Sequence, residues 1–384
     1  MIKRTLQELC LNITDGKHGD CENEENSGYY FISCKDIFDG QINYKNARQI
    51  TKADFEETHK RTMLEVDDIL LTNSGTIGRM AFVTDREATT KTTFQKSVAI
   101  IKPDKQKVLP RYLYYQLQNC VPQFINSSNG SAQKNLLLST MRTFQIEIEE
   151  NREKQEKIAN TLSAYDDLIE NNQKQIKLLE EAAQRLYKEW FVDLRFPEHE
   201  NTKIVDGVPE GWKKNCAEKF FEITIGKTPP RTEKRCFTTG KNGIPWVSIA
   251  DMGNSGMFVL NTAENLTDDA IKQYNVKVIP KNAVLLSFKL TVGRVAIAPN
   301  DICTNEAIAH FKGRRECERE YTYFYLKNFH YDELGSTSSI SKAVNSKIIK
   351  AMPFIMPSEK LLKEYSSKTK DIFDLIICKQ KNGQ

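Results

Sequence analysis

The sequence lacks a long apolar run. None of its 384 residues belongs to a stretch near the roughly 18 apolar residues that a membrane helix needs. Residues 1–12 also lack the apolar centre and cleavage site of a signal peptide. Only nine cysteines occur, without a C-x-x-C pair. This pattern excludes a disulfide framework, offers no zinc site, and predicts reduced thiols in a soluble, cytoplasmic protein.

Motifs that bind phosphate or carry out catalysis are absent as well. Gly226-Lys227-Thr228 resembles the end of a P-loop, but Phe221 stands where the first glycine belongs and Pro229 follows where a helix should begin. No G-x-G-x-x-G segment occurs, and the five histidines stand apart from any nucleophile motif. We therefore expect a chain that is not an enzyme and binds no cofactor or metal of its own.

The overall charge is small but unevenly distributed. The net charge is +4, which by itself does not indicate a nucleic-acid-binding protein. Residues 150–202 carry 8 basic and 12 acidic side chains, whereas residues 203–357 carry 22 basic and 16 acidic ones. The charge is therefore organised in modules, which predicts segments with different partners.

What the sequence does contain is an internal repeat. Residues 68–72 and 76–81 return 215 residues later as 283–287 and 291–296. Further pairs recur in the same order: 13–17 with 223–227, 32–37 with 247–252, 133–136 loosely with 341–344, and 167–169 with 374–376. Such shared order over nearly the whole chain indicates two copies of one unit.

Each copy combines strands with helices. Residues 68–72 and 283–287 are short apolar runs of the kind found in buried strands, and turns containing glycine follow them. Residues 112–117 and 321–326 are typical of helices. The expected fold class is α+β, with two similar domains related by a pseudo-two-fold internal repeat.

A long helix is predicted over residues 150–192, which would extend roughly 60 Å. Its apolar residues recur at alternating steps of four and three, as in a coiled-coil seam. The seam consists of Ile158, Leu162, Tyr165, Ile169, Asn172, Ile176, Leu179, Ala183, Leu186 and Trp190. Asn172 is its one polar member, and two explanations stay open: it sets the helix register, or it lies where the seam meets water.

A shorter helix with the same pattern is expected at the end of the second copy, with Tyr365, Ile372 and Ile376 in its seam. Two helices related by a pseudo-two-fold axis pack antiparallel. The longer helix must then expose part of its apolar seam or cover it with another protein chain.

Both repeated loops end in Thr-x-Gly-Arg, with Arg79 in the first copy and Arg294 in the second. An arginine side chain presents a planar fork that matches guanine or phosphate, and glycine allows the backbone to approach a ligand closely. The alternative, that each arginine forms an internal salt bridge, stays open at this point.

Taken together, these segments resemble the specificity subunit of type I DNA restriction–modification systems. The resemblance covers essentially the whole chain. It is carried by residues 69–79, by Gln133-Lys134-Asn135-Leu136, by the helix from Lys154 to Phe191, and by Val208-Pro209-Glu210-Gly211-Trp212. The resemblance implies two target recognition domains with two long antiparallel coiled-coil-like helices between them. It also implies a bipartite asymmetric DNA site.

The resemblance also implies the domain division and the partners. Recognition domains are expected over 1–149 and 213–357, the spacer helix over 150–194, a linker over 195–212 and the short C-terminal helix over 358–384. The implied partners are double-stranded DNA, two methyltransferase subunits and translocase–nuclease subunits. S-adenosylmethionine and ATP with Mg²⁺ would then be bound by those partner subunits.

The loop positions that match between the copies are the predicted DNA contacts. In the first copy they are Thr14, Lys17, His18, Asn73, Ser74, Thr76, Arg79, Ser131, Gln133 and Lys134. In the second copy they are Thr224, Lys227, Thr228, Ser287, Lys289, Thr291, Arg294, Ser341 and Lys342. Two rival interpretations are a coiled-coil scaffold that binds only protein and an autonomous DNA-modifying enzyme.

Overall fold

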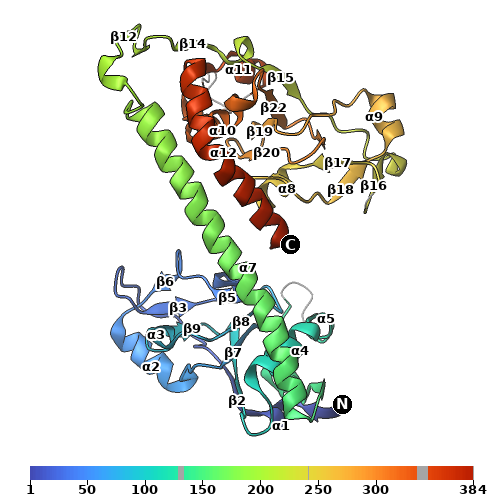
Figure 1. The fold of residues 1–384 in the computed structure, drawn as a ribbon. Coiled ribbons are helices and arrows are strands. Elements are labelled where there is room, and N and C mark those ends of the chain that lie inside the picture. Colours follow the sequence, from blue (N-terminus) through green and yellow to red (C-terminus); the bar gives the residue numbers. More distant parts are fainter. Residues whose placement is uncertain (129–133, 241, 335–344, 384) are drawn as a thin grey trace. The chain divides into compact units, whose positions relative to one another are not determined.

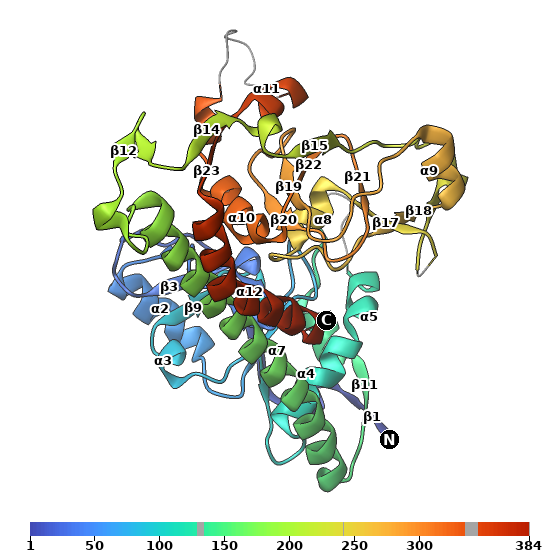
Figure 2. The ribbon, with the colours of Figure 1, turned by 45° about the horizontal axis from the view of Figure 1, so that its top comes forward.

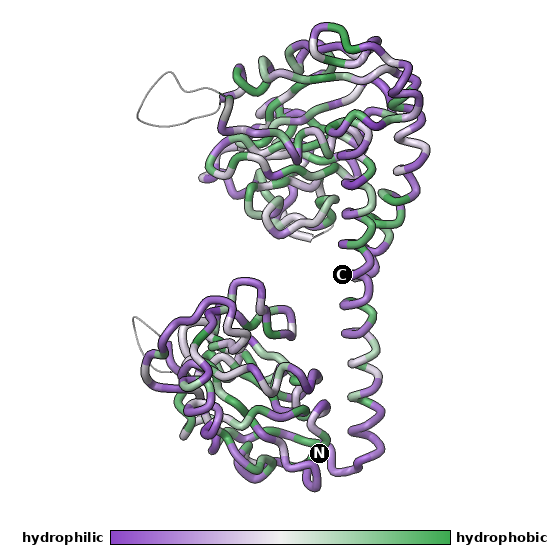
Figure 3. The backbone as a smooth tube through the Cα atoms, turned by 90° about the vertical axis from the view of Figure 1, so that its left-hand side faces the viewer, coloured by the Kyte–Doolittle hydropathy of each residue, from purple (hydrophilic) through white to green (hydrophobic). Residues whose placement is uncertain are grey.

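The computed structural model describes residues 1–128, 134–240, 242–334 and 345–383. The chain divides into two compact units, Met1–Asp166 and Asp167–Gln384, and each is described by itself (Figures 1 and 2). Figure 3 shows the hydrophobic residues, in green, gathered inside each unit. Among the described residues, every helix is too short or too polar to cross a membrane.

Both units are built on a four-stranded antiparallel sheet with the same strand order. In the first unit the order is β2 (Cys10–Asp15), β10 (Val98–Pro103), β7 (Ile69–Thr72) and β8 (Met80–Phe82). In the second unit it is β15 (Glu222–Ile225), β22 (Ile308–Lys312), β19 (Val284–Ser287) and β20 (Val295–Ile297). Leu70 pairs with Ala81, and Leu285 pairs with Ala296, so the repeat extends to the strand register.

In β7 and β19 apolar residues do not alternate with polar ones, because both faces of the sheet are covered. Leu71 faces one hydrophobic cluster, which includes α4 (Pro110–Asn119), while Leu70 faces another. In the same way Leu286 packs towards α10 (Arg319–Asn328), while Leu285 packs on the opposite face. The α+β class expected from the sequence is therefore confirmed, with one helix at the equivalent position in each unit.

The first repeated segment contains a glycine for a steric reason. A Cβ atom on Gly16 would lie 1.9 Å from the carbonyl oxygen of Phe94, and one on Gly226 would lie 2.1 Å from that of Asn305. Both contacts are with backbone, which cannot rotate away. Each unit therefore needs a residue without a side chain where the first sheet strand leaves the sheet.

The long helix α7 (Arg152–Tyr187) continues into a π-helical turn, Lys188–Val192. Its first half belongs to the first unit, where Ala159 is buried in the core. The buried Gln155 accepts a hydrogen bond from the backbone N–H of Leu109 and donates one to the carbonyl of Glu149. The first bond attaches the start of α7 to the start of α4, and the second attaches it to the segment that follows β11 (Gln145–Ile148).

The second half of α7 packs against α12 (Glu359–Asn382) within the second unit, and the two helices run antiparallel (Figure 1). The Tyr365 hydroxyl, near the start of α12, donates to the carbonyl oxygen of Ala183, near the end of α7. Lys379, near the end of α12, lines the same cavity as Ile169, which lies earlier in α7. The predicted antiparallel helix pair is confirmed.

The seam of α7 is covered only along its second half. Helix α12 has 24 residues against 36 in α7, and the seam is buried or half-buried from Asn172 onwards. Asn172 is 5% exposed and is the first covered residue of the seam; its Nδ2 atom has no hydrogen-bond partner among the described residues. Ile158, Leu162, Tyr165 and Ile169 are exposed, and we call them the open stripe of α7.

Candidate nucleic-acid interface

Three segments of the first unit meet beside the end of its sheet. They are the residues after β2, the loop after β7, and the residues before α6 (Leu138–Thr143). Ser74 forms a β-bridge with Asn135, and the backbone N–H of Leu136 donates to the carbonyl of Asn73 at 2.8 Å. The segments enclose a cavity of about 540 Å³, which brings the predicted residues His18, Asn73 and Ser74 together.

Basic side chains line this cavity from elements that are distant in sequence. Arg61 extends from α2 (Lys52–Thr62) and its Nη2 lies 2.5 Å from Oδ1 of the buried Asp15. The other oxygen of Asp15 lies 2.9 Å from Nε2 of His18. Lys96 is exposed at the rim. One carboxylate thus orients two groups that can donate to phosphate or to a base.

Lys17 has a different environment from that expected for a DNA contact. Its ammonium group lies 3.1 Å from Asp54 and 3.1 Å from Glu57, both on α2. The hydrogen bonds to these two carboxylates raise the pKa of Lys17. Its charge is already paired, so this side chain attaches α2 to the loop. Thr14 is half-buried, and its hydroxyl donates to the Asp15 carbonyl.

The hairpin loop after β7 leaves its tip in solvent. Thr76 and Arg79 are exposed, and no described residue forms an ion pair or a hydrogen bond with the Arg79 guanidinium group. The Thr72 hydroxyl closes the hairpin by accepting from the Arg79 backbone N–H. Lys134 is exposed too, while Ser131 and Gln133 lie outside the described residues.

The equivalent loop of the second unit uses its residues differently. Ser287 is buried, and its hydroxyl donates to the Thr291 carbonyl and accepts from the Arg294 N–H, so it shapes the turn. The Arg294 side chain donates to the carbonyl of Ile249 at 2.7 Å instead of forming an internal salt bridge. Lys289 and Thr291 remain exposed at the tip, next to the exposed Leu290.

The remaining predictions for the second unit lie just after β15 and at residues 341 and 342. The backbone N–H of Lys227 donates to Thr304, and the Thr228 hydroxyl bonds to the Glu306 carboxylate, which lowers the pKa of Glu306. Ser341 and Lys342 lie outside the described residues. No group of three or more potential metal ligands gathers in the part of the chain that the structure describes.

A buried histidine connects the strands beneath these loops. His310 on β22 lies 2.9 Å from the Thr224 hydroxyl and 2.6 Å from the Thr304 hydroxyl. Because the Thr304 hydroxyl donates to Asn305, it accepts from His310 Nε2–H, and Nδ1 accepts from Thr224. Burial lowers the pKa of His310 from 6.5 to about 3. The imidazole is therefore neutral near pH 7.

This pKa predicts how the stability of the second unit depends on pH. Below about pH 6.5 the unfolded chain protonates His310 while the folded unit does not. The unfolding free energy should therefore fall with decreasing pH between about 6.5 and 3, by up to about 1.4 kcal/mol per pH unit from this group. Denaturant titrations over this range should show a smaller slope for His310→Gln. An unchanged slope in His310→Gln would contradict the lowered pKa of His310. An equal decrease of the slope in the control His199→Gln, at an exposed site, would contradict it too.

Sequence comparison between the copies could not find all residues of the site. Arg61 and Lys96 lie outside every repeated segment, and only the packing of α2 against the sheet brings Arg61 to the cavity. No spacing in the sequence indicated Arg61 or Lys96.

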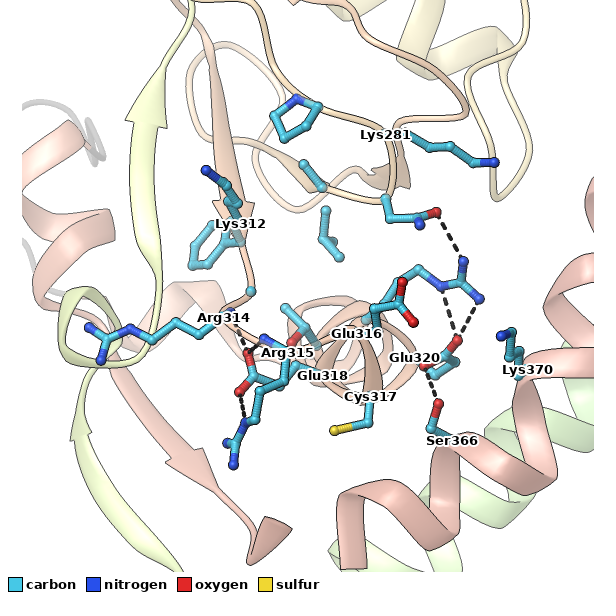
Figure 4. Close-up of a pocket in the computed structure, with 18 of the residues that line it drawn as sticks. Lys281, Lys312, Arg314, Arg315, Glu316, Cys317, Glu318, Glu320, Ser366 and Lys370 are labelled. Atoms are coloured by element: carbon cyan, nitrogen blue, oxygen red, sulfur yellow. Dashed lines mark hydrogen bonds and ion pairs between the residues drawn. The ribbon is translucent and has the colours of Figure 1, made fainter.

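A second basic cavity, of about 570 Å³, lies at the other end of the second sheet (Figure 4). It adjoins the first residue of β19 and the last of β22, whereas the candidate loop follows the last residue of β19. Arg315 pairs with the buried Glu318, and Arg319 pairs with the buried Glu320. Arg319 also donates to the Asn282 side chain before β19 at 3.0 Å, which attaches α10 to that end of the sheet. By its position this cavity is separate from the candidate interface.

Comparisons with known proteins show which family the chain is similar to. A family model described as the type I restriction modification DNA specificity domain matches residues 3–181 and 209–377. The chain is 27% identical over 369 residues to the type I restriction enzyme MjaIX specificity subunit of Methanocaldococcus jannaschii, with 91% of this chain and 81% of the relative covered. It is 24% identical over 342 residues to the HindI specificity subunit of Haemophilus influenzae, covering 72% and 73%.

A solved structure shows the same fold. The crystal structure of the type I restriction–modification S subunit from M. genitalium aligns with a TM-score of 0.59. The alignment covers 100% of this chain and 95% of that one, at 14% sequence identity. At this identity the likeness establishes the fold alone. It does not identify individual DNA-contact residues.

Proposed function

The chain belongs to the type I restriction–modification DNA specificity family, and we propose that each of its two units reads one half of a bipartite DNA site. As a specificity subunit of a type I restriction–modification complex it determines the DNA target and is itself non-catalytic.

The observation that carries the proposal is one fold that presents two different loops. Asn73-Ser74-Gly75 of the first unit corresponds to Phe288-Lys289-Leu290 of the second, at the same place after the third strand of each sheet. Two loops with the same backbone fold and different side chains should read different DNA sequences. The two half-sites are therefore expected to differ, and the target to be asymmetric.

The helices provide the second part of the proposal. In the family resemblance, two methyltransferase subunits dock on them, and translocase–nuclease subunits join the complex. The open stripe of α7 supports this, because an exposed apolar stripe usually marks a partner surface. S-adenosylmethionine and ATP with Mg²⁺ would be held by those partners. Segments 1–149 and 213–357 would read DNA, 150–194 and 358–384 would dock partners, and 195–212 would connect them.

Methylome sequencing tests this function. Cells without other methyltransferases should express the full chain together with the methyltransferase subunit of its own system. The expected result is one methylated motif with two short, different specific parts separated by a constant unspecific gap. A continuous or palindromic motif would contradict the two-unit proposal. Methylation by the methyltransferase alone, at the same motif, would remove the role of this chain.

A further inference from the structure

One buried amide in the first unit lacks a hydrogen-bond partner. Asn73 follows β7 and is 4% exposed, and its Oδ1 atom has no partner among the described residues. Its backbone is held at both ends: the N–H donates to Ser97 at 3.1 Å, and the carbonyl accepts from Leu136 at 2.8 Å. An unpaired buried amide oxygen is unfavourable and calls for a specific explanation.

The second unit shows that the fold does not require this amide. Phe288 occupies the equivalent position, is 1% exposed, and its N–H donates to the carbonyl of Ala307 at 2.9 Å. The same backbone arrangement thus accepts a purely apolar side chain. Since an apolar residue would satisfy the turn, the unpaired amide of Asn73 is explained better by a ligand than by the fold.

Asn73 is one of the residues that line the cavity enclosed by the three segments. Ser74 and Asn135 form one wall, and His18, Arg61 and Lys96 supply basic groups around it. A ligand here would meet one side-chain acceptor with no partner, together with the cationic side chains of Arg61 and Lys96. The edge of a DNA base can offer a donor to the Asn73 amide oxygen. The flanking phosphates offer acceptors to the basic side chains.

We infer that this cavity takes the major-groove edge of an adenine and that Asn73 determines specificity for it. This inference rests on the proposed function. A primary amide offers one acceptor and one donor, and adenine offers the complement, the N6 amino donor and the N7 acceptor. Guanine and thymine present only acceptors to Oδ1, and cytosine presents only a donor.

The test exchanges the amide for a carboxylate of the same shape. Asn73→Asp has two acceptors, which suit the cytosine N4 amino group and not the N6/N7 pair of adenine. In the complex with the methyltransferase subunit, one adenine of one half-site should lose its advantage over other bases by about 10-fold or more. The other half-site should be unchanged. Asn12→Asp adds the same charge at an exposed position of β2 and should leave the motif unaltered.

A second measurement leaves the protein untouched. Binding of the wild-type complex to duplexes with 7-deazaadenine at single positions should fall about 10-fold at one adenine only. This arm holds even where Asn73→Asp reduces the yield of folded complex, which thermal unfolding will show.

The outcomes separate the two proposals. An unchanged motif in Asn73→Asp, an equal loss on all DNA, a half-site without adenine, or no position sensitive to 7-deazaadenine each overturns the adenine reading. The proposed function is tested first, with the wild-type complex alone. If that complex methylates no bipartite motif, the proposed function fails before any variant is compared.

Discussion

Gly16→Ala is expected to lower the unfolding free energy of the first unit by at least about 3 kcal/mol. The new methyl group would stand 1.9 Å from the carbonyl oxygen of Phe94, well inside van der Waals contact. The clash is with backbone, and that backbone is held because the N–H of Lys17 donates to the same Phe94 carbonyl. Relief requires the end of β2 to move away from the sheet, which also displaces His18 from the cavity.

The chain offers a matched control for this substitution. Gly19→Ala meets only the flexible end of the Lys17 side chain, at 3.9 Å, and should change stability by less than about 0.5 kcal/mol. All three tryptophans, Trp190, Trp212 and Trp246, belong to the second unit. Denaturant unfolding followed by circular dichroism should therefore shift in Gly16→Ala, while the tryptophan fluorescence transition should stay in place. Equal effects of the two alanines would refute the steric argument.

The second large effect is expected at the open stripe of α7. Leu162 is 39% exposed and Tyr165 is 63% exposed, although both belong to an apolar seam. If a methyltransferase subunit covers them, Leu162→Asp places an unpaired carboxylate in an apolar interface, which costs several kcal/mol. Affinity for the methyltransferase subunit should then fall at least about 100-fold, with little change in the folding of the free chain.

Isothermal titration of the purified chain with its methyltransferase subunit measures this loss. Asn160→Asp is the control, since it adds the same charge at an exposed residue about 200° around the helix from Leu162. It should bind like the wild type. Full affinity of Leu162→Asp would show that the stripe is not the docking surface. A parallel loss of thermal stability in the free chain would show that the stripe supports the fold instead.

Much of the architecture was accessible from sequence patterns. The repeat predicted two similar α+β units, and the strand registers of the two sheets correspond residue by residue. The alternating apolar steps predicted the long helix and an antiparallel partner, and the shorter second helix predicted a seam only partly covered. These features depend on residues close together in the chain, whose periodicity directly reflects strand or helix geometry.

The candidate site was accessible only in part. Matching the copies selected loops that do meet, such as those of His18, Asn73 and Ser74. It could not show that the Lys17 charge is paired by residues 37 and 40 positions away, or that Ser287 turns inwards. It also missed Arg61, which lies outside the repeated segments. Each of these outcomes depends on how a helix or a loop packs against the sheet.

The local order of residues thus specifies the kind of element, its length and the presence of two copies, because helix and strand periodicities are short-range properties. Which side chains are free to meet DNA depends on the folded chain. Pairing, burial and the unpaired amide of Asn73 arise where segments more than 20 residues apart come within hydrogen-bond distance. Such distances follow from sheet register and packing, and no short window of sequence contains them.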